Sequence, residues 1–365
     1  MSIAGIVLVQ GSNQSQSVSS FSNDSDVPFG NRNLTLLDLL GDSLLNRVVT
    51  RLQTYGIQPV TVISDIDLAQ FPHLNWDNEA TLECSPSSTI PTSLQSVLNE
   101  FSKRNVKAVV SIQLSAYAEV DFFDLLRFHR EHGKAVTSVY DAEGPLQISV
   151  FNLKQLMQGA ELLCDSWNGS SWDRNRSLGK RYTFDGYVNR LETPYDFRRL
   201  AKDSLYKRCE LRPAAREVRP GLWVGDWARI DSRARILSPA YIGARSKIRA
   251  AALITRGSCV ERHCEVDCGT IIDDAHILPF SYLGPGLEVG HALVDGSRLL
   301  HFVRNLELQI RDRRLLGRLG SPNPLLRLKD KVLERILSGV AEDLPAPTPS
   351  PEAASLHTAG EIAPS

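Results

Sequence analysis

Aliphatic side chains recur at every sixth position along the second half of the chain, without interruption over ten positions. A period of six fits neither the 3.6-residue turn of an α-helix nor the simple alternation of a strand. It requires short strands separated by tight turns, with one aliphatic side chain pointing inward from each strand. The series consists of Val224, Ile230, Ile236, Ile242, Ile248, Ile254, Val260, Val266, Ile272 and Leu278.

A second series, of small side chains, lies four positions after each aliphatic residue. A small residue is expected where the chain turns a corner around a narrow interior. The series comprises Ala228, Ala234, Ala240, Ser246, Ala252, Ser258, Cys264 and Thr270, and it ends at His276 and Tyr282. The two series together predict strands stacked upon one another.

Residues 1–208 alternate strand-like and helix-like segments, which is typical of an α/β domain with a largely parallel sheet. The pattern predicts strands over 3–9, 60–63, 108–112 and 135–140, and helices over 44–52 and 122–128. Thr193, Pro194 and Asp196 supply a capping hydroxyl, a proline at the first helical position and an early carboxylate. We therefore expect a further helix that ends near Lys207.

The remaining segments are distinguished by composition. Residues 209–222 contain Pro213 and Pro220 and are expected to form a linker, and the repeat region should then cover 223–297. Residues 298–338 form a basic C-terminal extension with ten Lys or Arg against four acids. An apolar stripe there predicts an amphipathic helix that packs back on its own domain; it consists of Leu325, Leu328, Val332 and Ile336. The Pro-, Ala- and Ser-rich segment 339–365 is expected to be disordered.

Composition and charge are those of an ordinary globular protein. The 365 residues carry 41 basic and 42 acidic side chains, so a nucleic-acid partner is not indicated. The apolar run Ile3–Val9 is too short to span a bilayer. Six cysteines without a CxxC pair argue for reduced thiols and against a disulfide framework. We expect a cytoplasmic protein with no membrane span.

The repeat resembles the hexapeptide-repeat, left-handed parallel β-helix, in which three hexads make one triangular coil. The handedness is implied by the resemblance alone, because the spacing does not reveal it. At three hexads a coil, Val224, Ile242, Val260 and Leu278 would stack on one face of a prism of about three coils.

An α/β nucleotidyltransferase-like domain, Rossmann-like with a mainly parallel sheet, followed by such a β-helix resembles the sugar-nucleotide pyrophosphorylases. These enzymes transfer a nucleotidyl group from a nucleoside triphosphate to a sugar 1-phosphate. The resemblance covers residues 1 to about 297, and four segments carry it: the opening strand that ends at Gln10 and Gly11, Leu39–Leu45, Asp121–His132, and Glu192–Phe197 with its Thr-Pro turn.

The motifs that would perform nucleotidyl transfer are degenerate in this chain. The opening strand continues as Gln10-Gly11-Ser12-Asn13 where the family has Gly-Gly-x-Gly-x-Arg, and the first lysine of the chain is Lys103. Where the family's metal carboxylates would stand, this chain has Gln113-Leu114 and Arg190. Transfer needs cations for the triphosphate and Mg²⁺ on carboxylates. We therefore expect no metal site and assign no catalytic residue.

The resemblance and its departures favour a pseudoenzyme: a nucleotide- or sugar-phosphate-binding, regulatory or scaffolding homologue. The candidate ligand-binding residues are Gln10, Gly11, Arg32 and Arg190. No cofactor is evident. Flat flanks of parallel strands favour a homo-oligomer, or a mixed oligomer with an active paralogue.

Two alternatives remain open. The first is an active nucleotidyltransferase that makes a sugar nucleotide with Mg²⁺ and holds phosphate through residues such as Arg32 or Arg190. The second is a hexapeptide-repeat acyltransferase, for which the candidate general bases are His263, His276 and His291. A metal site at the cluster Cys259, His263, Cys264 and Cys268 is less favoured, because these residues occupy different places in the hexad.

Overall fold

The computed structural model describes residues 2–10, 28–66, 68, 80–84, 90–158 and 179–320. Met1–Leu319 form one compact unit. Gly11, the expected amphipathic helix and the segment 339–365 lie outside the described residues. Among the residues that are described, no helix combines the length and the apolar character needed to cross a membrane.

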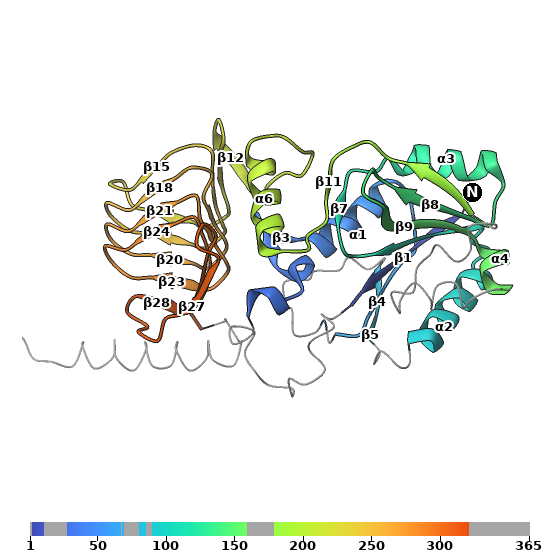
Figure 1. Cartoon of the computed structure of the whole chain (residues 1–365), viewed down its shortest axis with the longest axis horizontal. Coiled ribbons are helices and arrows are strands. Elements are labelled where there is room, and N and C mark those ends of the chain that lie inside the picture. Colours follow the sequence, from blue (N-terminus) through green and yellow to red (C-terminus); the bar gives the residue numbers. More distant parts are fainter. Residues whose placement is uncertain are drawn as a thin grey trace, which may run out of the picture. The chain divides into compact units, whose positions relative to one another are not determined.

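The N-terminal region is built on a mixed, mainly parallel sheet of seven strands in the order β10-β8-β9-β6-β1-β4-β5 (Figure 1). Only β9 runs antiparallel to its two neighbours. The strands are β1 (Ile3–Val9), β4 (Val60–Ser64), β5 (Ala80–Cys84), β6 (Ala108–Gln113), β8 (Val136–Tyr140), β9 (Pro145–Asn152) and β10 (Gly179–Thr183). The strands expected from the sequence are therefore present.

Helices cover both faces of this sheet. Alternate side chains of β1 point to opposite faces and therefore enter two different cores. Val7 and Val9 join the core beneath α1 (Leu44–Thr54) and α3 (Phe122–His132). Ile6 and Leu8 join a second core beneath α2 (Ile90–Lys103), which α4 (Leu153–Gln158) completes. The helix expected after Thr193 is α6 (Pro194–Leu205), with the Thr193–Asp196 capping box formed.

Three short features complete this region. Asn33 caps the 3-10 turn η4 (Leu34–Leu36), which follows η3 (Phe29–Asn31). A hairpin joins β2 (Asp38–Leu39) to β3 (Asp42–Ser43). A two-stranded ladder joins β7 (Tyr117–Ala118) to β11 (Val188–Asn189).

Residues 216–318, called here the stacked-strand region, contain many short parallel strands arranged in three sheets, consistent with a β-helix. The first sheet contains β12 (Arg216–Arg219), β13 (Leu222–Val224), β16 (Ala240–Ile242), β19 (Cys259–Val260), β22 (His276–Ile277), β25 (Ala292–Asp295), β26 (Arg298–His301) and β27 (Leu306–Gln309). The second contains β14 (Arg229–Ile230), β17 (Lys247–Ile248), β20 (Glu265–Val266), β23 (Ser281–Leu283) and β28 (Leu316–Arg318). The third contains β15 (Arg235–Ile236), β18 (Leu253–Thr255), β21 (Ile271–Asp273) and β24 (Glu288–Gly290).

The register confirms most of the inward series but corrects its last member. Ile242 pairs with Val260, eighteen positions on, but Val260 pairs with Ile277, only seventeen positions on. Ile277 therefore lies in the interior, and Leu278 points the other way, into the core shared with the N-terminal region. The strand stack also continues past the expected three coils, because Val294 pairs with Ile277.

The segments on either side of the repeat contain regular structure. The expected linker 209–222 includes β12, and Cys209 and Leu211 are buried in the shared core. The described part of the basic extension forms antiparallel strands: β26 pairs with β25, and β28 pairs with β23. These strands add to the sheets of the stacked-strand region.

Candidate ligand-binding cleft

A cleft of about 410 Å³ lies where β1 and β6 end. In open α/β sheets, ligands bind at the carboxyl ends of the parallel strands. Its lining comes from the ends of β1 and β6, the start of η4, the start of β9 and the segment after β11. The lining residues are Gln10, Arg32–Thr35, Gln113–Ala116, Pro145–Gln147 and Arg190–Glu192. The structure thus brings together three of the four candidate residues, Gln10, Arg32 and Arg190.

Neutral amide side chains form one wall of the cleft. Gln113 Nε2 donates to Gln10 Oε1 at 2.7 Å, and Asn33 Nδ2 donates to the Gln10 carbonyl at 2.7 Å. Gln147, with φ of 57°, has a buried Oε1 that accepts no hydrogen bond from the described residues. Amides both donate and accept, so this wall matches the uncharged polar groups of a base or a sugar.

Arg32 is held by the stacked-strand region. Its guanidinium pairs with Asp295 at the end of β25, and both side chains are less than a tenth exposed. The same guanidinium lies over the Phe29 ring, 4.7 Å from its centroid. A phosphate that approached Arg32 would have to compete with a buried carboxylate.

Arg190 is held by two carboxylates of the β8–β9 turn. Its Nη2 lies 2.5 Å from Asp141 Oδ1, and its Nε lies 3.0 Å from Glu143 Oε2. Asp141 Oδ1 also accepts the backbone N–H groups of Glu143 and Gly144, which fixes the turn. Both arginines of the cleft are therefore already paired with carboxylates, although Arg32 shares Asp295 with Arg318, whose Nη1 lies 3.8 Å from Asp295 Oδ1.

Several carboxylates near the cleft are engaged by other groups of the protein. A neighbouring pocket of about 680 Å³ is rich in carboxylates, among them Asp141, Asp196 and Asp203. Asp141 is paired with Arg190, Asp196 belongs to the α6 capping box, and Asp203 accepts the Tyr187 hydroxyl at 2.8 Å. Within the described ranges, no group of three His, Cys, Asp or Glu is arranged to hold a metal ion.

The three histidines considered for acyl transfer have different surroundings. His276 is fully buried, and burial lowers its pKa; its Nε2 lies 2.9 Å from Glu261 Oε1, which leaves no access for a substrate. His291 Nδ1 lies 2.8 Å from Asp274 Oδ2 at a half-buried position. His263 stacks on Phe280, with ring centroids 4.9 Å apart.

The cysteines of the sequence cluster do not converge. Cys259 lies in the core shared with the N-terminal region, whereas Cys264 lies inside the stacked-strand region, and Cys268 is exposed. Burial raises the pKa of the Cys259 thiol to about 12, so this thiol is protonated at neutral pH.

Glu261 is a buried charged residue that no sequence motif indicated. It is fully buried, and its carboxylate accepts the N–H groups of Leu40 and Gly41 at 2.7 and 2.9 Å as well as contacting His276. Its position at a repeat turn gives no local sign of this contact, because the partners are more than 200 positions away. Glu261 fastens the β2–β3 hairpin to the stacked-strand region.

Comparison with known proteins gives one partial similarity. The chain is 33% identical over 85 residues to a UTP–glucose-1-phosphate uridylyltransferase of Synechocystis sp. (strain ATCC 27184 / PCC 6803 / Kazusa). The aligned stretch covers 22% of this chain and 21% of that protein, so the chain spans about a fifth of the curated relative it matches. The similarity indicates a sugar-nucleotide transferase-like relationship. No family model matches the chain.

Proposed function

We propose that the chain is a sugar-nucleotide pyrophosphorylase-like protein that binds a nucleotide, a sugar phosphate or a sugar nucleotide in the cleft between β1, β6 and β9. It acts as a binding, regulatory or scaffolding homologue rather than as a transferase. In this proposal the N-terminal region is nucleotidyltransferase-like, and the stacked-strand region is a left-handed β-helix. The partial similarity to a uridylyltransferase supports the relationship.

The observation that carries the proposal is the pairing of both cleft arginines with carboxylates beside a wall of amides. Nucleotidyl transfer requires free positive charge to hold a triphosphate and to stabilise the leaving pyrophosphate. Arg32 and Arg190 instead neutralise Asp295, Asp141 and Glu143. The amides of Gln10, Gln113 and Gln147 remain suited to hydroxyl and base groups. Such a cleft supports binding better than transfer.

The test is calorimetric titration of the full chain with UTP, glucose 1-phosphate and UDP-glucose, each with and without Mg²⁺. We expect saturable binding of at least one ligand and about tenfold weaker binding after Gln113→Ala, which is what one lost hydrogen bond of about 1.4 kcal/mol gives. Gln309→Ala, on an exposed residue of β27, is the matched control. The absence of binding by every ligand would refute the proposal.

Arg190→Ala tests, in the same assay, whether Arg190 affects ligand affinity through its charge or only through the shape of the cleft. The substitution leaves Asp141 and Glu143 without their cation, so phosphate-bearing ligands should lose more affinity than uridine does. An equal loss for both would show that Arg190 only shapes the cleft. Release of pyrophosphate from UTP and glucose 1-phosphate above the rate of an Arg32→Ala/Arg190→Ala control would establish the active-transferase alternative.

A further inference from the structure

The first repeat of the stacked-strand region has unpaired strand edges. β12, β14 and β15 are each the terminal strand of their sheet and are paired only with β13, β17 and β18 respectively. The outer edge of each therefore presents backbone N–H and C=O groups that no strand covers. Such edges are templates for an added strand.

Apolar side chains are exposed around these edges. Trp227, in the turn between β13 and β14, is 81% exposed, and Ile230 of β14 is 38% exposed although it belongs to the inward aliphatic series. Ile230 is uncovered because no earlier strand lies against β14. Val218 and Leu237 are also exposed. Apolar groups gathered beside free strand edges mark an interaction surface.

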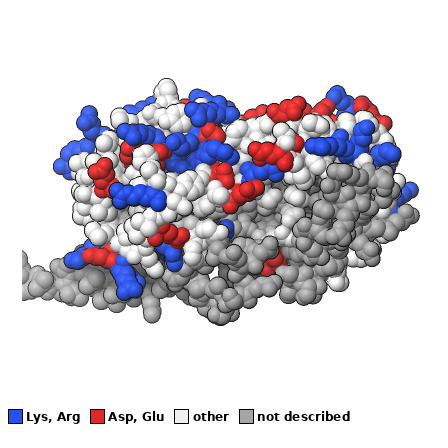
Figure 2. All heavy atoms as spheres, viewed as in Figure 1, with Lys and Arg blue, Asp and Glu red and all other residues white. Residues whose placement is uncertain are grey.

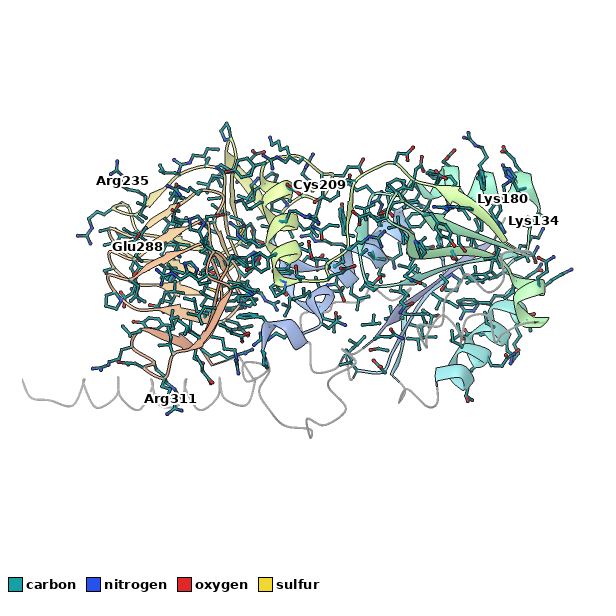
Figure 3. The ribbon with its side chains drawn as sticks, in the orientation of Figure 1. Lys134, Lys180, Cys209, Arg235, Glu288 and Arg311 are labelled. Atoms are coloured by element: carbon teal, nitrogen blue, oxygen red, sulfur yellow. The ribbon has the colours of Figure 1, made fainter. Side chains whose placement is uncertain are left out.

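The same part of the chain is strongly basic. Residues 216–249 hold eight basic and three acidic side chains. The basic ones are Arg216, Arg219, Arg229, Arg233, Arg235, Arg245, Lys247 and Arg249. Figure 2 shows Lys and Arg gathered over the part of the surface where Figure 1 labels β12 and β15, and Figure 3 places Arg235 at its outer edge.

Much of this charge has no internal partner. Lys247 and Arg249 both pair with Glu265, and Arg233 pairs with Asp231. Arg216, Arg229 and Arg235, by contrast, form no ion pair with any residue that the structure describes. A groove of about 560 Å³ runs beside Arg229 and Ile230 and reaches Lys247 and Arg249.

We propose that this first-repeat end (residues 216–237 with Lys247 and Arg249) docks an acidic, partly apolar segment of a partner protein, which extends along the free edge of β14. Carboxylates of the segment pair with Arg229 and Arg235, its apolar side chains cover Ile230 and Trp227, and its backbone completes the sheet.

Charge and backbone chemistry select this occupant over two others. A second copy of the chain that docked end to end would bring the same arginines against one another. A nucleic acid would neutralise the arginines, but it has no amide backbone to pair with a strand edge. An acidic extended peptide satisfies the arginines, the apolar side chains and the strand edge together.

The test uses the full chain and a fluorescein-labelled peptide of alternating Glu and Val, about ten residues long, in an anisotropy titration. We expect saturable binding that weakens with added salt and falls at least tenfold in Arg229→Glu/Arg235→Glu. Arg311→Glu/Arg313→Glu makes the same charge change at exposed arginines between β27 and β28 and should bind as the parent does (Figure 3). Quenching of Trp227 fluorescence, lost in Trp227→Phe, gives an independent readout.

Four outcomes would overturn the proposal. The first is no saturable binding of the peptide, and the second is an equal loss in the control variant. The third is unchanged affinity for a peptide with alternate backbone nitrogens methylated, because such a peptide cannot complete the strand edge. The fourth is a preferred occupant of another class: oligo-dT that displaces the peptide, or self-association of the chain that Arg229→Glu/Arg235→Glu abolishes.

Discussion

Asp38, on the β2–β3 hairpin, is a carboxyl group held in the interior. It is 3% exposed, and its Oδ2 lies 2.8 Å from Nε of Arg262. Burial raises its pKa from 3.8 to about 7, Glu261 and Asp42 act in the same direction, and Arg262 and Arg47 oppose the shift. Between these two pH values the folded state keeps a proton that the unfolded state has lost. Asp38 therefore lowers the free energy of unfolding as the pH rises through this window.

Asp38→Asn removes that titration and should reveal it. The unfolding free energy of the variant relative to the parent should increase from pH 4 to pH 7, by at most about 1.4 kcal/mol per pH unit. Urea denaturation at a series of pH values measures this difference. The titration of buried His276 affects the parent and the variant alike, so it cancels from the difference. Asp226→Asn, at an exposed aspartate, is the control. A difference that does not change with pH would contradict the prediction.

The β2–β3 hairpin shows how a short element depends on a distant one. Leu40 and Gly41 have φ of 56° and 90°, which turns both N–H groups toward Glu261. A Cβ at position 41 would lie 2.4 Å from the Tyr241 hydroxyl, so the close approach requires glycine. The hairpin is therefore held by three residues of the stacked-strand region: Tyr241, Glu261 and Arg262.

Glu261→Ala should strongly destabilise the protein. The change leaves the buried N–H of Leu40 and the half-buried N–H of Gly41 without an acceptor and should cost about 3 kcal/mol of unfolding free energy. Chemical denaturation measures the cost, and Glu288→Ala, at an exposed residue of β24, should cost under about 0.5 kcal/mol. A loss of less than about 1 kcal/mol for Glu261→Ala would show that water replaces its contacts.

Local periodicity predicted the strands of the repeat, because one aliphatic position fixes each strand. The turn between β21 and β22 is one residue shorter than the repeat requires. This was not predicted, although the sequence carried a sign of it. The small-residue series ends at His276 because the shortened turn gives the small, buried place to Ala275. Asp274 occupies that turn with φ of 49° and binds Arg198 and Lys202 of α6. Contacts with a distant helix, which periodicity does not encode, accompany this change of phase.

The candidate cleft was predictable only in part. The family resemblance pointed to Gln10, Arg32 and Arg190, and the structure places them along one cleft. The carboxylates that neutralise the arginines were not predicted, because Arg32 and Asp295 are 263 positions apart and Arg190 and Asp141 are 49 apart. Charge pairs of this kind arise from the tertiary fold and leave no pattern in the local sequence.

At the scale of the whole molecule, one core joins the two regions. Tyr241, Leu278 and Leu293 of the stacked-strand region belong to the same apolar cluster as Leu200 of α6 and Val7 of β1. Arg198, which is 4% exposed, reaches from α6 to Asp274 and to the Gly257 carbonyl, both at 3.0 Å. The described body is thus expected to unfold as a unit.

We expect a single cooperative unfolding transition for the full chain. Far-UV circular dichroism reports both regions. Trp223 packs against the shared core, so its fluorescence, isolated by replacing the other four tryptophans with Phe, reports the junction of the two regions. The two signals should give the same urea midpoint. Midpoints that differ, with the dichroism showing two steps, would indicate that the regions unfold independently.

The Arg32–Asp295 pair has a thermodynamic consequence. One partner lines the cleft, and the other ends strand β25 of the stacked-strand region. Any ligand that draws Arg32 away from Asp295 must also perturb the end of β25. By reciprocity, any factor that stabilises the packing of β25 must lower the binding affinity of that ligand by the same free energy. For such a ligand, binding in the cleft and the stability of the end of β25 are therefore thermodynamically coupled.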